Sequence, residues 1–83
     1  MSQSQALAPT AVYRVPSAFR NRTEYVGLMP TGHVVAYSLV KGETLFTSLT
    51  EMCNRFEWDA ADIAYWPMLP NAASFSFFVP CDA

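Results

Sequence analysis

Charged residues are scarce in this sequence. Lys, Arg, Asp and Glu make up 14% of its 83 residues, against about 25% in typical soluble proteins. With a formal net charge of −2, the chain lacks both the basic stripe that binds phosphate backbones and the dense acidic surface of a DNA mimic. Its apolar fraction of 52% excludes a disordered, solvating chain, so we expect it to fold.

Residues that carry chemistry are also few. One histidine, His33, and two cysteines, Cys53 and Cys81, do not supply the closely spaced ligands that a zinc site needs. The three dispersed glycines match neither a phosphate-binding loop nor a dinucleotide-binding fingerprint. We therefore expect no catalytic residue, no metal and no cofactor, and a protein that is not an enzyme.

Signals for export or membrane insertion are missing as well. The first seven residues carry neither a positive region nor an apolar one, and no apolar run approaches the ~18 residues of a membrane span. We expect a cytoplasmic protein that does not bind a membrane and whose thiols are reduced.

The length fits one domain, which buries only about 60–65% of its unfolded surface. Residues 1–9 are mostly small and polar and end at Pro9, so we expect a flexible N-terminal arm. Residues 10–83 then form a single α+β domain.

Four segments have the composition of β-strands. Residues 10–15 contain Val and Tyr, and residues 24–29 and 33–40 flank Pro-Thr-Gly at 30–32, which predicts a β-hairpin. Residues 73–79 alternate phenylalanine and valine with serine, the pattern of a half-buried strand that ends at Pro80.

A helix is predicted from Thr44, which we expect to be its N-cap. An apolar stripe at helical spacing places five side chains on one face: Leu45, Leu49, Met52, Cys53 and Phe56. Residues 63–66 fit either a strand, which the aromatic residues favour, or a short helix capped by Asp59. The predicted fold is an α+β domain in which one amphipathic helix packs on one face of an antiparallel sheet of about four to five strands.

The segment after Tyr65 is the best candidate for a partner-binding site. Trp66, Met68 and Leu69 lie in a stretch stiffened by two prolines, and such side chains are enriched at interface centres. We predict them as apolar anchors, with Arg20 and Arg22 as polar contacts. The alternative, in which this segment closes the open end of the core, stays open.

Taken whole, a compact chain without a leader sequence or a catalytic constellation resembles the small accessory proteins of bacteriophages, among them anti-CRISPR proteins. The segment Trp66-Pro67-Met68-Leu69-Pro70 is similar to the Trp-x-Pro-Leu-Pro ending of a phage family of unknown function, with a different spacing. The resemblance implies a non-enzymatic inhibitor that acts in the host cytoplasm by occupying a functional surface of a host or defence protein complex.

Two other functions are kept as hypotheses. A small nucleic-acid-binding module, which we expect less, would stack bases on sheet aromatics beside the arginines. A self-assembling subunit such as a homodimer would hide an edge strand or the helix. The aromatic residues of the first hypothesis are Tyr25, Tyr37, Phe75, Phe77 and Phe78.

Overall fold

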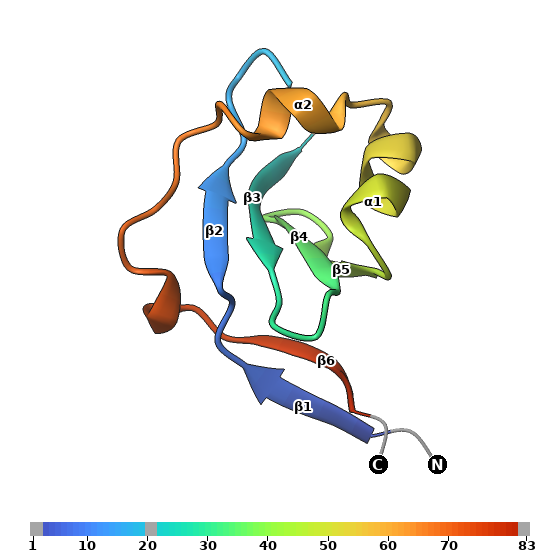
Figure 1. Cartoon of the computed structure of the whole chain (residues 1–83), viewed down its shortest axis with the longest axis vertical. Helices are drawn as coiled ribbons and strands as arrows, with labels where there is room; N and C mark the ends of the chain where they lie inside the picture. The colour runs from blue at the N-terminus through green and yellow to red at the C-terminus, as the bar shows by residue number, and fades with distance from the viewer. Residues whose placement is uncertain (1–2, 20–21, 82–83) are drawn as a thin grey trace.

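The computed structural model describes residues 3–19 and 22–81. Its mixed α and β content confirms the predicted fold class. Figure 1 shows a four-stranded antiparallel sheet of order β2-β3-β4-β5 and a separate two-stranded sheet, β1-β6. The elements are β1 (Gln3–Leu7), β2 (Ala11–Arg14), β3 (Thr23–Leu28), β4 (Val34–Ser38), β5 (Gly42–Phe46), α1 (Leu49–Phe56), α2 (Ala60–Ile63), the 3-10 helix η1 (Ala72–Ser74) and β6 (Phe77–Cys81).

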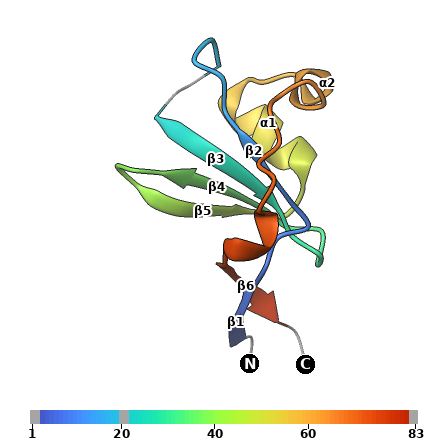
Figure 2. The same ribbon diagram turned by 90° about the vertical axis from the view of Figure 1, so that its left-hand side faces the viewer.

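Both faces of the four-stranded sheet are covered by other parts of the chain. Successive side chains of a strand point to opposite faces, so each strand contributes to both sides. On β4, Val34 and Ala36 face α1 and α2, and they share a core with Met52 and Trp66. We call this side the helix face. Figure 2 shows the helices on this side of the sheet and η1 with β6 on the other.

The opposite face carries a second, smaller core. Val35 of β4 is buried there together with Val12, Met29, Phe77 and Val79. Because β6 supplies two of these five side chains, the two-stranded sheet is held to the body of the protein by apolar packing.

The N-terminal segment is more ordered than the sequence predicts. Residues 3–7 of the expected flexible arm form β1, which pairs with β6 so that Leu7 lies opposite Phe77. Pro80, expected to end the last strand, lies within β6. Proline is tolerated in a strand at an edge, where its missing N–H removes no ladder hydrogen bond.

The predicted β-hairpin is confirmed as β3 and β4. Gly32 has a φ of 94°, and its N–H donates to the carbonyl of Met29 over 3.0 Å, which closes the turn at residues 30–32. Positive φ values favour glycine because it has no Cβ.

The helix starts later than predicted. Thr44 and Leu45, expected on the helix, belong to β5, and α1 begins at Leu49 with Ser48 as its N-cap. The Ser48 hydroxyl accepts a hydrogen bond of 3.1 Å from the N–H of Glu51. Serine is among the best N-cap residues, so the capping signal at 48 overrides the apolar spacing that extended the helix backwards.

Residues 63–66 do not form a strand, which corrects the preferred interpretation. Asp59 caps the short helix α2, since its carboxylate accepts a 3.0 Å hydrogen bond from the N–H of Ala61. The chain then turns at residues 64–66. The side-chain cap thus overrides the strand preference of the aromatic residues.

The segment that follows runs along the outer edge of β2. The N–H of Arg14 donates to the carbonyl of Pro67 over 2.9 Å, and that of Leu69 donates to the carbonyl of Val12 over 2.8 Å. These bonds satisfy backbone groups that an open sheet edge leaves unpaired.

Candidate functional site

The turn between β4 and β5 holds its shape through its own side-chain and backbone geometry. The Ser38 hydroxyl accepts hydrogen bonds of 3.1 Å and 3.3 Å from the N–H groups of Val40 and Lys41. Gly42, with a φ of 77°, pairs with Ser38 and closes a three-residue loop. A serine that bonds to the backbone ahead of it is a recurrent way to fix a turn.

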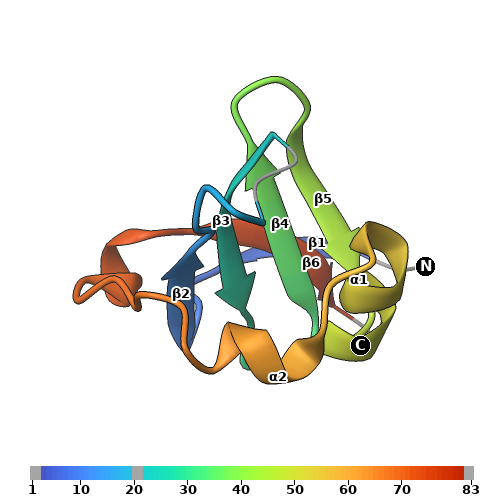
Figure 3. The same cartoon turned by 90° about the horizontal axis from the view of Figure 1, so that it is seen from above.

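The tip of this turn is apolar. Leu39 is 73% exposed and Val40 is 69% exposed, two consecutive aliphatic side chains where turns usually carry polar residues. Figures 2 and 3 show the turn projecting beyond the rest of the chain. We call Leu39 and Val40 the apolar tip. Exposed turns normally carry polar residues, and departures from such local preferences tend to occur at functional sites.

An aromatic cleft adjoins the tip on the face opposite the helices. It has a volume of about 500 Å³, and Leu39 forms part of its wall. The ring centroids of Tyr25 and Tyr37 lie 6.3 Å apart, and those of Tyr25 and Phe75 lie 5.8 Å apart. The lining residues are Tyr25, Tyr37, Leu39, Glu43, Ser74, Phe75, Ser76 and Phe77.

A β-bulge places Tyr25 on this face. The register between β3 and β4 shifts between Thr23 and Tyr25, so that Thr23 lies opposite Ser38 and Tyr25 lies opposite Tyr37. Without the extra residue, Thr23 and Tyr25 would share a face of the strand. The bulge therefore sends Thr23 to the helix face and Tyr25 to the cleft.

The cleft contains one ionisable acidic side chain. Glu43 is exposed on β5, opposite Tyr37 in the register, while the other lining side chains are aromatic, aliphatic or hydroxyl-bearing. An apolar cleft with a single carboxylate fits an apolar partner surface that carries a basic group.

Trp66, predicted as an apolar anchor, is a core residue in this structure. It is 5% exposed, and its ring centroid lies 5.5 Å from that of Phe19 and 5.2 Å from that of Trp58. Its indole Nε1 has no hydrogen-bond partner among the described residues. Trp66 therefore closes the core, which is the alternative that the sequence left open for this position.

Met68 and Leu69, the other two predicted anchors, separate in the structure. Met68 is 58% exposed, and its backbone lies opposite Tyr13 of β2. Leu69 is half-buried against the second core. Met68 alone of the three predicted anchors presents a largely exposed side chain.

The predicted arginine contacts are not brought to the cleft. Arg22 is exposed and lies beside Thr23, Ala36 and Ser38 on the helix face, whereas Arg20 lies outside the described residues. The structure instead brings forward the apolar tip, which sequence reasoning missed. The signal was present, because two aliphatic residues stand directly before Lys41-Gly42.

The surroundings of Cys53 and His33, two potentially reactive side chains, do not activate them for catalysis. Burial raises the pKa of the Cys53 thiol, and the charge of Asp59 raises it further. Cys53 is 4% exposed, so a high thiol pKa and low access together make it a poor nucleophile. The Nδ1 of His33 lies 2.7 Å from the hydroxyl of Thr31 in the β3–β4 turn.

The described part of the chain holds neither a group of metal-ligating side chains nor a membrane-spanning helix. Within residues 3–19 and 22–81, no three or more His, Cys, Asp or Glu side chains cluster in a way that would hold a metal ion. No helix in the same ranges has the length and apolar character needed to cross a membrane.

Comparison with protein-family models, with curated proteins and with solved structures gives no match for this chain.

Proposed function

We propose that this chain is a non-enzymatic protein-binding module of the phage-inhibitor type, which occupies a functional surface of a host or defence complex in the host cytoplasm. The observation that carries the proposal is the apolar tip, held in place by Ser38 and Gly42 beside the aromatic cleft. A fixed tip loses little conformational entropy on binding, so most of its apolar burial contributes to affinity.

The chemistry of the tip and cleft defines the partner surface. Leu39 and Val40 enter an apolar depression of the partner, and the rings of Tyr25 and Tyr37 contact its rim. A basic side chain of the partner faces Glu43. Tyrosine at such a position supplies a large apolar area and a polar hydroxyl, the combination enriched at interface centres.

The arrangement favours a protein partner over nucleic acid. Four of the five aromatic residues of the base-stacking hypothesis do line the cleft, but Phe78 does not, and Arg22 lies on the opposite face of the sheet. Single-stranded nucleic acid binding combines stacking rings with cations along the same groove. The charged residue in this cleft is instead the acidic Glu43, which repels phosphates.

Affinity capture from bacterial lysate tests the proposal. The tagged protein is incubated with nuclease-treated lysate, washed at moderate salt and compared with a Leu39→Ser/Val40→Ser variant. We expect a stoichiometric, nuclease-resistant protein complex with the wild type and its loss with the tip variant. The matched control is Phe78→Ser, which removes a side chain that is 63% exposed on β6 and does not line the cleft.

Three results would overturn the proposal: equal capture by the wild type and the tip variant, capture of nucleic acid alone, or recovery of this chain alone. The second points to the nucleic-acid hypothesis and the third to self-assembly. Circular dichroism of each variant checks that it is folded before the comparison.

A further inference from the structure

We infer that a cationic pocket on the helix face binds a phosphate monoester that carries a small apolar group. The pocket has a volume of about 250 Å³ and lies between α1 and strands β3, β4 and β5. The sheet separates it from the aromatic cleft, whereas it shares the β4–β5 turn with the apolar tip, because Ser38 and Lys41 line the pocket. The inference uses none of the side chains that form the tip or the cleft, so it stands independently of the proposed function.

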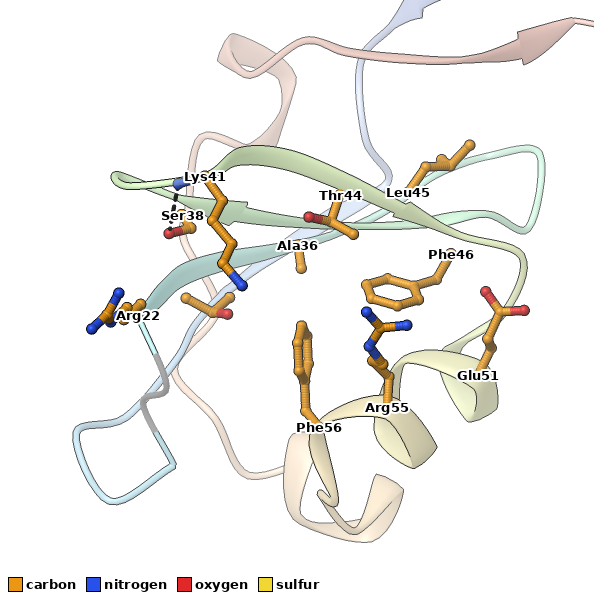
Figure 4. A pocket seen from close by; sticks show the side chains of 11 residues that line it. Arg22, Ala36, Ser38, Lys41, Thr44, Leu45, Phe46, Glu51, Arg55 and Phe56 are labelled. Atoms are coloured by element: carbon orange, nitrogen blue, oxygen red, sulfur yellow. Dashed lines mark hydrogen bonds between the residues drawn. The ribbon is translucent and has the colours of Figure 1, made fainter.

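Three cations line the pocket, and two of them point into it. Figure 4 shows Lys41 reaching in from the β4–β5 turn and Arg55 rising from α1, whereas Arg22, just before β3, lies at the rim with its guanidinium pointing outward. The whole sequence holds only five Lys and Arg residues, and three of these five line this one small cavity. Among the described residues, none of these three side chains forms an ion pair.

Glu51, the acidic residue that lines the pocket, does not neutralise Arg55. Glutamate four residues before arginine on a helix is the favourable arrangement for an ion pair. In this structure both carboxylate oxygens of Glu51 are used by Thr47, whose hydroxyl donates over 2.8 Å and whose N–H donates over 3.2 Å. These bonds lower the pKa of Glu51 and hold its charge at the start of α1.

The backbone at Arg22 is held in an unfavourable conformation. Its φ is 78°, in the left-handed region that residues other than glycine rarely adopt. The β-bulge that follows places Thr23 opposite Ser38, so both hydroxyl-bearing residues line the pocket. Residues in strained conformations cluster at binding sites, because the surrounding structure must enforce them.

The pocket matches the chemistry of a doubly charged anion. Guanidinium groups donate paired hydrogen bonds to phosphate oxygens, and an ammonium group adds a point charge. Three cations against one carboxylate favour a dianion over a carboxylate ligand. The apolar part of the lining accommodates an organic group beside the phosphate; it consists of Ala36, Leu45, Phe46 and Phe56.

Phenyl phosphate is a suitable probe, because it joins a phosphate to one small apolar ring. In an NMR titration of the whole chain, we expect saturable shifts at the amides of Lys41 and Gly42 and at the side-chain Nε–H groups of Arg22 and Arg55. Inorganic phosphate binds more weakly than phenyl phosphate because it lacks the ring, and benzoate binds more weakly because it carries one charge.

Variants that replace one cation by a neutral polar side chain provide the decisive comparison. Lys41→Gln and Arg55→Gln each lower the affinity for phenyl phosphate at least about fivefold, since each removes a charge-assisted hydrogen bond. The matched control Arg14→Gln leaves the affinity unchanged, because Arg14 is an exposed arginine of β2 that does not line the pocket.

The pH dependence supplies a second measurement. A phosphate monoester loses its second proton near pH ~6, so binding weakens as the pH falls from about 7.5 to about 5.5. A peptide that carries phosphotyrosine distinguishes the two sources of the ligand. Affinity equal to that of phenyl phosphate indicates a free small ester, and tighter binding indicates a phosphorylated side chain of a partner.

The inference is overturned if the shifts do not saturate, if Arg14→Gln weakens binding as much as Arg55→Gln does, or if benzoate binds as tightly as phenyl phosphate. The first two results indicate a general attraction of anions to basic residues. The third indicates an apolar site without selectivity for a dianion.

Discussion

Gly27 lies beneath the ring of Phe77, and this contact joins the two sheets. A Cβ added at Gly27 would lie 2.8 Å from Cε2 and 3.2 Å from Cδ2 of that ring. The ring has little room to move, because Phe77 is 5% exposed and is stacked on Phe75 at 6.3 Å. We therefore predict that Gly27→Ala forces Phe77 out of its place and destabilises the protein.

The size of the effect follows from two opposing contributions. Overpacking of a core by one methyl group costs typically about 1–3 kcal/mol. Replacing glycine by alanine returns about 0.4–1 kcal/mol by restricting the unfolded chain. The net loss is about 1–2 kcal/mol, which in a domain of this size lowers the Tm by about 5–15 °C.

Thermal and urea unfolding of a double-mutant cycle test this reasoning. In a Phe77→Leu background the nearest ring atom, Cε2, is gone and the smaller, flexible side chain can turn away from the new methyl group, so Gly27→Ala costs less than about 0.5 kcal/mol. The control is Gly42→Ala, which adds a methyl group with no neighbour within 4 Å at a φ of 77° and costs the same in both backgrounds. A full Gly27→Ala cost in the Phe77→Leu background would refute the contact between the sheets.

Three further predictions concern the core and the start of α1. Trp66→Ala lowers the free energy of unfolding, measured in urea, by about 3–5 kcal/mol. Trp66→Phe lowers it far less, because it keeps an aromatic ring and removes only an indole N–H that has no partner among the described residues. Thr47→Val raises the pKa of Glu51 toward its ordinary value in an NMR titration, because it removes the main hydrogen bond that lowers this pKa. The hydrogen bonds to the charged Glu51 stabilise the wild type fully at pH values above the ordinary pKa of glutamate. This stabilisation is lost as the pH falls through the lowered pKa, so the difference in unfolding free energy between wild type and variant narrows in acid. Cys53 reacts with iodoacetamide at pH 8 at least about tenfold more slowly in the folded protein than in urea, as measured by peptide mapping, because it is buried and its thiol pKa is raised.

The elements that the sequence predicts correctly have local signals. The β3–β4 hairpin follows from two apolar runs around Pro-Thr-Gly, and the buried positions of β6 follow from alternation, since Phe77 and Val79 are buried while Phe78 is exposed. In both cases the side chains themselves determine the face that is buried.

The elements that the sequence misses depend on distant parts of the chain. Residues 3–7 are mostly polar, and their strand is formed by pairing with β6, whose partners lie 70 to 78 positions away. Leu45 lies four residues before Leu49, so its position fits the helical stripe by chance. In the structure it pairs with Val35 of β4 and belongs to β5. Tertiary pairing overrides local preference in both places.

The candidate site was predicted only in part, for the same reason. The nucleic-acid hypothesis, which the sequence favoured less, placed Tyr25, Tyr37 and Phe75 on one sheet platform, and these three line the cleft together. The sequence did not show that Trp66 fills the core, because a tryptophan is equally suited to a core and to an interface. Nor did it show that a bulge directs Thr23 and Tyr25 to opposite faces.

The most direct test of the central claim is the equilibrium affinity of the captured partner for two variants of this chain. Leu39→Ser/Val40→Ser removes the apolar tip, and Met68→Ser removes the exposed side chain of the segment that the sequence favoured. Recognition by the tip predicts a loss of at least about 100-fold for the first variant, since a pair of anchoring side chains is worth several kcal/mol, and an unchanged Kd for the second. Full affinity of the tip variant, with binding lost in Met68→Ser, would contradict it.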